Sequence, residues 1–398
     1  MSLSSSLHTS GGSSMREKSA LLDPFNIISV LVIAALVVVS ILAQADAHFY
    51  AGGTQYERHM VWVLVGGVTF LLAAVIDLRI VERIAYAYFG LCIVLLIATL
   101  FAGTSVNNST RWLRFGSVNI QASEFVKLGV ILALARYLQR RRERKPGETG
   151  AVQSGKYGLR ELVAPMLIVL LPAPLVLLQP DLGTTLMAIF VAATMLAVEG
   201  IQRRAAIILT IFTLVLIPVA WSSGLVKDYQ KDRVRLLAYD DWQKIDPETN
   251  VIHESRRTQA EQSMWAIGTG GLTGQGHRNA NTQRMRVFPE VHTDFISAMV
   301  AEQFGFLGMM MLLFLYWWVV VWGLRTGLDS RSRFCRLVAT GVAALFGWQV
   351  FVNVGMVTTI LPVVGVPLPF LSYGGSAFMM LMACLGLVLN IARKRGRM

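Results

Sequence analysis

Three ionisable side chains stand close together just before a long apolar run, at about 295–323. They are Glu290, His292 and Asp294, and Glu302 follows two helical turns inside the run. A carboxylate held beside apolar surroundings has a raised pKa, which suits a general base. Asp294 could instead be only a helix cap. The segment predicts either proton-transfer chemistry or an ordinary helix start.

A second polar segment runs from Arg111 and Trp112 to Lys127. Ser123 is a plausible N-cap for the apolar stretch that follows. Glu124 and Lys127 are three residues apart, so on a helix they share a face and can form an ion pair. The segment is a candidate functional site, because ionisable groups within membrane spans are costly. A capped helix start with a local ion pair would explain the same residues.

Two further polar segments interrupt the apolar sequence. Gln179 and Asp181 lie in a tight turn, where Asp181 either lines a cavity or caps the next helix. Prolines and glycines break the chain at 362–376, around Ser372 and Tyr373. Irregular backbone at membrane depth is tolerated only when it is buried in protein or lines a cavity. Both segments are therefore candidates for substrate contact, or for structural turns.

The composition indicates a membrane protein. Of 398 residues, 54% are hydrophobic and only 15% are charged, and the mean hydropathy is +0.55. Soluble domains are nearer one-quarter charged. We expect an all-α polytopic protein with ten transmembrane helices. The expected spans are about 25–43, 60–76, 84–102, 124–138, 162–179, 182–198, 205–221, 295–323, 335–361 and 375–392.

The basic residues predict the orientation of these spans. Clusters of Lys and Arg fall in alternate loops, and the short loops between them hold only Arg58, Arg111 and Arg114. By the positive-inside rule both termini are cytoplasmic. The net charge of +12 is then mostly a topology signal, and it does not indicate nucleic-acid binding. The clusters lie at 16–18, 79–83, 140–160, 203–204, 325–336 and 393–397.

The remaining sequence predicts one domain. Residues 1–20 are rich in Ser and Gly and read as a disordered cytoplasmic tail, followed by a single transmembrane domain at 21–398. The run at 25–43 is too long for a signal-peptide core. A long polar outer loop covers about 222–294. The three cysteines are far apart and form no metal or disulfide pattern.

The predicted topology places all four polar segments on the outer side of the membrane. A structural explanation of each segment alone does not predict this shared location. We therefore expect one outward-facing cavity built from the fourth to the tenth span. Ionisable groups at membrane depth are costly and mark functional sites.

These segments, in this order, resemble the SEDS family (shape, elongation, division and sporulation). The resemblance covers nearly the whole chain. Leu182, where division proteins usually have Phe, favours the elongation branch of the family, as do Val363–Pro369 and 228–230. The resemblance is strongest at Arg111–Lys127, Gln179–Thr184, Gly268–Gly276, Pro289–Gly308 and Asn353–Ser376.

The resemblance implies a peptidoglycan glycosyltransferase that polymerises lipid II with inversion at the anomeric carbon. Asp294 matches the essential aspartate of the family, and it is the expected general base. A divalent cation, Mg²⁺ or Mn²⁺, is a candidate for stabilising the pyrophosphate, and no organic cofactor is expected. Expected substrate-binding residues are Arg111, Trp112, Glu124, Lys127, Gln179, Asp181, Glu290, His292, Glu302, Ser372 and Tyr373.

The same resemblance implies partners. A class B penicillin-binding protein would add the crosslinks, alongside elongation-complex proteins and membrane lipids. The sequence departs from the family pattern at Ala122, where Pro is usual, and at Gln303, where a second Glu is usual. A role for that second carboxylate is therefore in doubt. Two other functions fit the sequence: a transporter that flips a lipid-linked precursor, and a non-catalytic scaffold for a penicillin-binding protein.

Overall fold

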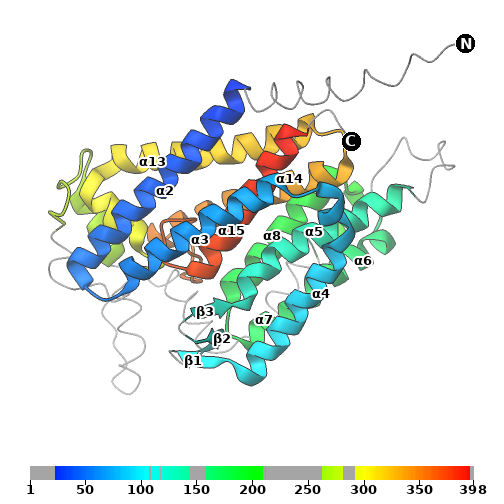
Figure 1. Ribbon diagram of the computed structural model, residues 1–398, viewed down its shortest axis with the longest axis horizontal. Helices are drawn as coiled ribbons and strands as arrows, with labels where there is room; N and C mark the ends of the chain where they lie inside the picture. The colour runs from blue at the N-terminus through cyan, green and yellow to red at the C-terminus, as the bar shows by residue number, and fades with distance from the viewer. Residues whose placement is uncertain are drawn as a thin grey trace, which may run out of the picture.

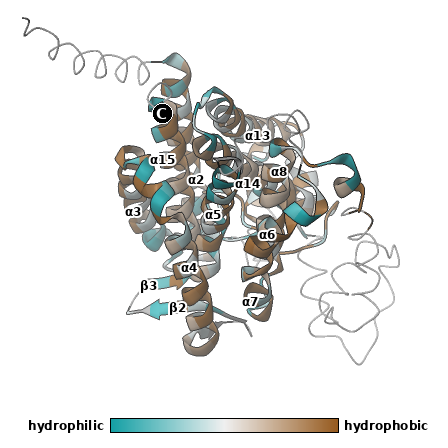
Figure 2. Ribbon diagram, turned by 90° about the vertical axis from the view of Figure 1, so that its right-hand side faces the viewer, coloured by the Kyte–Doolittle hydropathy of each residue, from teal (hydrophilic) through white to brown (hydrophobic). Residues whose placement is uncertain are grey.

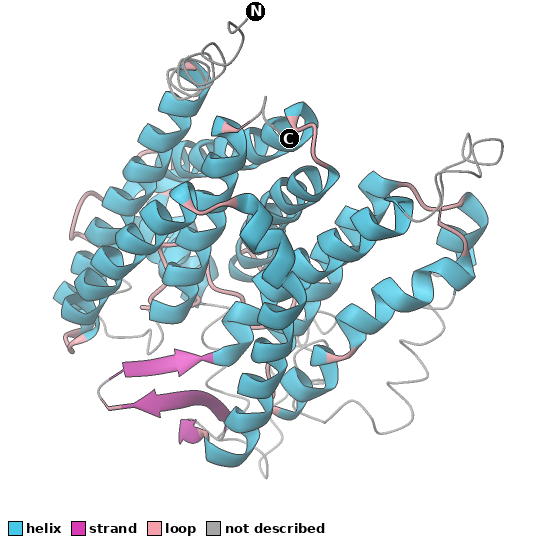
Figure 3. Cartoon of the chain, turned by 45° about the vertical axis from the view of Figure 1, so that its right-hand side comes forward, coloured by secondary structure: helices cyan, strands magenta, loops and turns pink. Residues whose placement is uncertain are grey.

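The chain forms a bundle of long helices with one small sheet at one end (Figures 1 and 3). The structure is a computed structural model. It describes residues 23–106, 109–116, 118–143, 157–208, 211, 262–280 and 292–394. The predicted tail at 1–20, most of the span at 205–221 and most of the loop at 222–294 lie outside the described residues.

The first three helices confirm the first three predicted spans and extend beyond them. They are α2 (Pro24–Ala51), α3 (Gln55–Val75) and α4 (Leu78–Ala102). The carboxylate of Asp23 accepts the Phe25 N–H at 3.1 Å at the start of α2, where Pro24 needs no partner. Asp77 caps α4 in the same way.

A three-stranded antiparallel sheet follows α4, and the sequence analysis did not predict it. It consists of β1 (Thr104–Val106), β2 (Ser109–Phe115) and β3 (Val118–Gln121), in that order. The strands are short, and membrane-span periodicity does not detect such elements. The sheet leads directly into the next helix and so fixes where that helix begins.

The central helices confirm the fifth and sixth predicted spans, and a helix lies at the position of the fourth. They are α5 (Ala122–Glu143), the kinked pair α6 (Leu159–Leu170) and α7 (Pro172–Leu178), and α8 (Leu182–Glu199). Pro172 separates α6 from α7, because a proline has no N–H to continue the helical ladder. Residues 179–181 make the predicted tight turn into α8.

The last three helices are α13 (Ile296–Asp329), α14 (Arg333–Val357) and α15 (Gly375–Arg393). A break at Gly305, with φ +64° and ψ −165°, divides α13. The N–H groups of Phe306 and of the next residue donate to carbonyls of the 271–272 turn, at 2.8 and 3.1 Å. The glycine-rich part of the long loop therefore satisfies backbone groups that the broken helix leaves open.

Eight helices in the described part of the chain are long and apolar enough to cross a membrane. They correspond to the predicted spans except the fourth and the seventh. The fourth is α5, which is 22 residues long but carries Glu124, Lys127 and several arginines. At about 1.5 Å per residue it is about 33 Å long, enough to span a bilayer. The predicted count of ten is therefore not established.

Burial separates the inner helices from the outer ones. In the most apolar window, 78% of the residues of α14 and of α15 are buried, against 17% for α3. The less buried helices expose apolar side chains, as a lipid-facing surface requires. Their ribbons are coloured mostly as hydrophobic residues in Figure 2. The start of α2 and the end of α15 lie together (Figure 1). We call this the inner end, and the opposite end with the sheet the outer end.

Candidate active site

A buried ion pair occupies the start of α5. Lys127 Nζ lies 2.7 Å from Oε2 of Glu124 and donates to its Oε1 at 2.8 Å. The side chains of Lys127 and Glu124 are 2% and 4% exposed. The predicted pair is confirmed. Desolvation of two charges offsets most of their attraction, so such a pair is weak evidence for stability and points to function.

Asp181 joins two helices. Its carboxylate caps α8 through the N–H and hydroxyl of Thr184, at 3.1 and 2.9 Å. It also accepts the hydroxyl of Ser123 at 3.0 Å and the amide of Gln121 at 3.2 Å. The predicted N-cap role of Ser123 is wrong, because α5 begins at Ala122, directly after β3, and places Ser123 inside the first turn. The capping role of Asp181 is confirmed.

Strand β2 positions Arg111 and Trp112. Arg111 Nε donates to the carbonyl of Gln179 at 2.9 Å, and its terminal nitrogen donates to the carbonyl of Pro180. These two acceptors are neutral groups, so they leave the positive charge of the guanidinium uncancelled. Trp112 is half-buried and pairs with Gln121 across the β2–β3 ladder. The predicted segment at Arg111–Lys127 therefore meets the predicted turn at Gln179 and Asp181.

Asp294 lies in the turn just before α13, and it is half-buried. The N-cap of α13 is Phe295, the residue after Asp294. Asn353 of α14 donates to the carbonyl of Asp294 at 3.0 Å and to that of Val366 at 2.8 Å. Oδ2 of Asp294 lies 3.4 Å from the place that a Cβ on Gly365 would occupy. The turn is thus held against the 362–374 loop.

Gln44, a fully buried residue of α2, ties His292 to that loop. Its amide donates to the carbonyls of His292 and Leu371, at 3.1 and 2.6 Å. The N–H of Tyr373 donates to the same His292 carbonyl at 2.7 Å. Helix α2 therefore holds both the segment before α13 and the 362–374 loop in place. Its contact with His292 is two residues before Asp294 in the chain.

The environment keeps His292 and Tyr373 neutral. Burial, with a smaller contribution from His48, lowers the pKa of His292 below its ordinary 6.5, although a backbone contact with Gly52 opposes the shift. Burial raises the pKa of Tyr373, and the nearby Arg58 partly opposes this shift.

The backbone of the 362–374 loop is irregular, as predicted. Phe370 has φ +66°, and its carbonyl accepts the hydroxyl of Ser40 from α2 at 2.8 Å. Ser372 accepts the N–H of Leu368 at 2.8 Å and so closes a turn within its own loop. A Cβ on Gly183 of α8 would lie 3.0 and 3.1 Å from carbonyls of this loop. The loop therefore packs on the start of α8.

The four predicted segments are linked in one chain of contacts at the outer end. The predicted outward-facing cavity stays a prediction. The linking contacts are Arg111 to Gln179, Ser123 to Asp181, Gly183 to Gly365, Gly365 to Asp294 and His292 to Tyr373.

Glu302 and Glu290 are two further residues that the sequence predicts to bind substrate. Glu302 is fully buried in the first segment of α13, and its carbonyl accepts the N–H of Gln275 at 3.0 Å. Gln303 is 1% exposed, and its amide has no hydrogen-bond partner among the described residues. Glu290 lies outside the described residues. Their roles in substrate binding stay predictions.

Several buried polar residues of α2 and α3 escaped the sequence analysis. Ser40 bonds His59 at 2.8 Å, and Gln44 makes the contacts described above. Asp46 is 3% exposed and lies 3.0 Å from Arg278 and 3.1 Å from His277. Ser40 and Gln44 are four residues apart in an apolar run, so their shared helix face was a usable signal.

The divalent cation stays a proposal. Within the described ranges, no three His, Cys, Asp or Glu side chains are grouped so that they could hold a metal ion. Pyrophosphate oxygens commonly supply part of the coordination shell of Mg²⁺, so a substrate-dependent site needs fewer protein ligands.

The fold and the site define a multi-pass protein of the bacterial inner membrane with a buried charged centre at one end of its bundle. The chain belongs to the family of cell cycle proteins that includes FtsW, RodA and SpoVE, whose model matches residues 20–397. This confirms the resemblance drawn from the motifs.

Relatives from both branches of the family align along most of the chain. The peptidoglycan glycosyltransferase MrdB of Escherichia coli K12 is 34% identical over 365 residues, 92% of each chain. A probable peptidoglycan glycosyltransferase FtsW of Geobacter metallireducens is 32% identical over 353 residues, 88% of each chain.

Solved structures share the fold. One is described as a peptidoglycan synthase complex that coordinates polymerization and crosslinking. Its matching chain has a TM-score of 0.74 and 28% identity, over 93% of this chain and 98% of that chain. The rod shape determining protein RodA of Thermus thermophilus has a TM-score of 0.64 and 27% identity, over 93% and 97%.

Proposed function

We propose that this chain is an inverting peptidoglycan glycosyltransferase that polymerises lipid II during cell elongation. The observation that carries the proposal is the placement of Asp294, a half-buried carboxylate beside Gly365. Hydrogen bonds from Asn353 to the carbonyl of Asp294, and from Gln44 to the carbonyl of His292, hold the turn that carries it. The names of the relatives support the same activity. The likeness to RodA supports elongation.

Asp294 would act as the general base. Its carboxylate takes the proton of the acceptor 4-hydroxyl as that oxygen forms a bond to the anomeric carbon of the donor. The bond from that carbon to the pyrophosphate oxygen breaks on the opposite face, and the polyprenyl pyrophosphate leaves as an anion. Since pyrophosphate leaves without protonation, no general acid is required.

Arg111 is the better placed cation for the leaving group. Lys127 is paired with Glu124, and the carboxylate cancels most of its field. Arg111 contacts only carbonyls of Gln179 and Pro180 in the contacts described above, so its charge remains available to a pyrophosphate. Mg²⁺ or Mn²⁺ would supply further positive charge when bound.

The partner and the orientation are part of the proposal. A class B penicillin-binding protein would crosslink the strands, in keeping with the synthase complex whose chain shares this fold. Elongation-complex proteins would organise the pair in the membrane. Both termini would face the cytoplasm and the sheet would face outward, in keeping with the Lys and Arg clusters at the inner end.

Polymerisation by the purified protein tests the function against its rivals. Lipid II is supplied in detergent, with and without a cognate class B penicillin-binding protein, and glycan length is measured on gels. An enzyme makes glycan strands. A flippase or a scaffold makes none, because the substrate needs no transport here; that result would overturn the proposal.

A further inference from the structure

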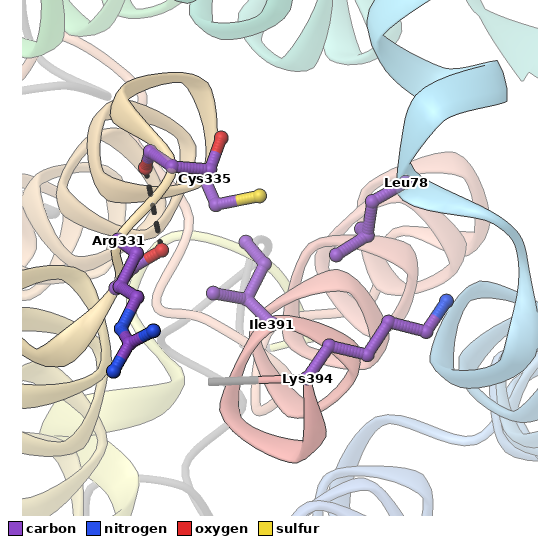
Figure 4. Close-up of a pocket in the computed structure, with 7 residues that line it drawn as sticks. Leu78, Arg331, Cys335, Ile391 and Lys394 are labelled. Atoms are coloured by element: carbon purple, nitrogen blue, oxygen red, sulfur yellow. Dashed lines mark hydrogen bonds between the residues drawn. The ribbon is translucent and has the colours of Figure 1, made fainter. Parts of the chain in front are cut away.

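A small pocket lies at the inner end, on the opposite side of the bundle from Asp294. It is formed where the start of α4, the α13–α14 turn and the end of α15 meet (Figure 4). Arg331 and Lys394 come from different elements and flank it (Figure 4). The lining residues are Leu78, Ser330, Arg331, Ser332, Cys335, Ile391 and Lys394.

The cations of this pocket have no carboxylate partner in the part of the chain that the structure describes. Lys394 Nζ donates only to the carbonyl of Ile76, at 3.3 Å, and Arg336 behind the turn donates to the carbonyl of Ser330 at the same distance. Arg331 is exposed. By contrast, Arg333 in the same helix bonds Glu199. The pocket therefore concentrates uncompensated positive charge.

The N-terminus of α14 also borders the pocket and offers uncharged N–H donors. Ser332 is the N-cap of α14 but makes no side-chain capping bond, so N–H groups of the first turn remain available beside the pocket. In contrast, the neighbouring start of α4 is capped by the carboxylate of Asp77. Two further carboxylates nearby have cationic partners of their own, since Asp329 lies 3.8 Å from Arg325 and Glu199 bonds Arg333. No carboxylate lines the pocket itself.

The surroundings suit a lipid better than a free anion. Leu328 and Ile80 lie within two residues of lining positions and are 74% and 47% exposed. Apolar side chains beside a basic pocket at the membrane boundary can hold acyl chains while the cations hold the headgroup. The positive-inside rule explains basic loops in general, but not two cations without a described carboxylate partner, one from the α13–α14 turn and one from the end of α15, around one pocket.

We propose that this pocket binds the phosphodiester headgroup of an anionic phospholipid from the inner leaflet. Lys394 and Arg331 supply the charge, beside the N-terminus of α14. The site is independent of the glycosyltransferase proposal, since it lies at the other end of the bundle.

Native mass spectrometry of the delipidated full chain in detergent tests this site. The probes are dioleoyl phosphatidylglycerol, dioleoyl phosphatidylcholine and inorganic phosphate. We expect one phosphatidylglycerol to bind more tightly than phosphatidylcholine, and Arg331→Gln/Lys394→Gln to weaken it about tenfold or more. A large excess of inorganic phosphate should leave the lipid bound.

The matched control removes two charges elsewhere at the inner end. Arg160→Gln/Arg204→Gln changes exposed residues outside the lining and should bind phosphatidylglycerol as the wild type does. If both double variants bind equally, or if phosphatidylcholine binds as well as phosphatidylglycerol, the site does not exist. Displacement by phosphate would show a site for free anions instead. If the Lys394 change impairs folding, Arg331→Gln alone, at an exposed side chain, carries the same test.

Discussion

Glu124 and Lys127 form a pair whose removal separates stability from activity. Replacing Lys127 alone with Met leaves a buried, unpaired carboxylate, and we expect it to destabilise the protein by about 3–5 kcal/mol. Glu124→Gln/Lys127→Met leaves no buried charge and should recover most of that stability. Thermal unfolding in detergent measures the first effect, and lipid II polymerisation measures the second.

The double variant decides the role of the pair. If it is stable but inactive, the charges serve the reaction. If polymerisation returns together with stability, the pair is only structural, and its assignment to substrate binding fails.

His292 should make the fold sensitive to acid. Its pKa is lowered in the folded protein, so the unfolded chain takes up the proton first as the pH falls below about 6.5. The wild type should therefore lose thermal stability as the pH falls from about 7 through 6.5, and His292→Gln should lose less. Parallel curves for the two proteins would assign the acid sensitivity to other groups.

The broken helix α13 depends on one glycine. Gly305 has φ +64° and ψ −165°, a region open only to glycine, and a Cβ there would lie 2.3 Å from the backbone nitrogen of Gly274. Gly305→Ala should therefore destabilise by at least about 1–3 kcal/mol. Gly347→Ala is the control, because its Cβ would make only ordinary contacts, at 3.7 Å or more. Equal melting temperatures for the two variants would contradict this description of α13.

Hydropathy predicted the helices that consist of long, uninterrupted apolar runs. The apolar runs that form α2, α4 and α15 were found because roughly 20 apolar residues have few other stable forms in a membrane. The sheet was missed, because its strands are short and polar. The break at Gly305 was missed because its carbonyl partners come from the 271–272 turn, more than thirty residues earlier in the chain.

The candidate site was predicted in part for a similar reason. Glu124 with Lys127, and Asp181 with its own helix, are local arrangements that spacing reveals. The contacts of Gln44 with His292, and of Asn353 with Asp294, join residues far apart in the chain. Spacing carries no information about such contacts, so only the structure identifies these supporting residues.

The orientation of the whole bundle can be tested with single cysteines. The native cysteines are all buried, so background labelling should be low. Arg114 in β2 and Arg204 after α8 are exposed at opposite ends. A membrane-impermeant maleimide should label Arg114→Cys in cells with a permeabilised outer membrane, and Arg204→Cys only after lysis. The reverse pattern would place the candidate site on the cytoplasmic side.

Polymerisation by the Asp294→Asn variant tests the catalytic assignment. The amide keeps the shape of the side chain but cannot accept the acceptor proton, so the rate of lipid II polymerisation should fall by about 10²–10⁴-fold while the melting temperature holds. Asp329→Asn, at the inner end, is the matched control and should retain the wild-type rate. A folded Asp294→Asn protein that polymerises lipid II within about threefold of the wild type would contradict the general-base role of Asp294.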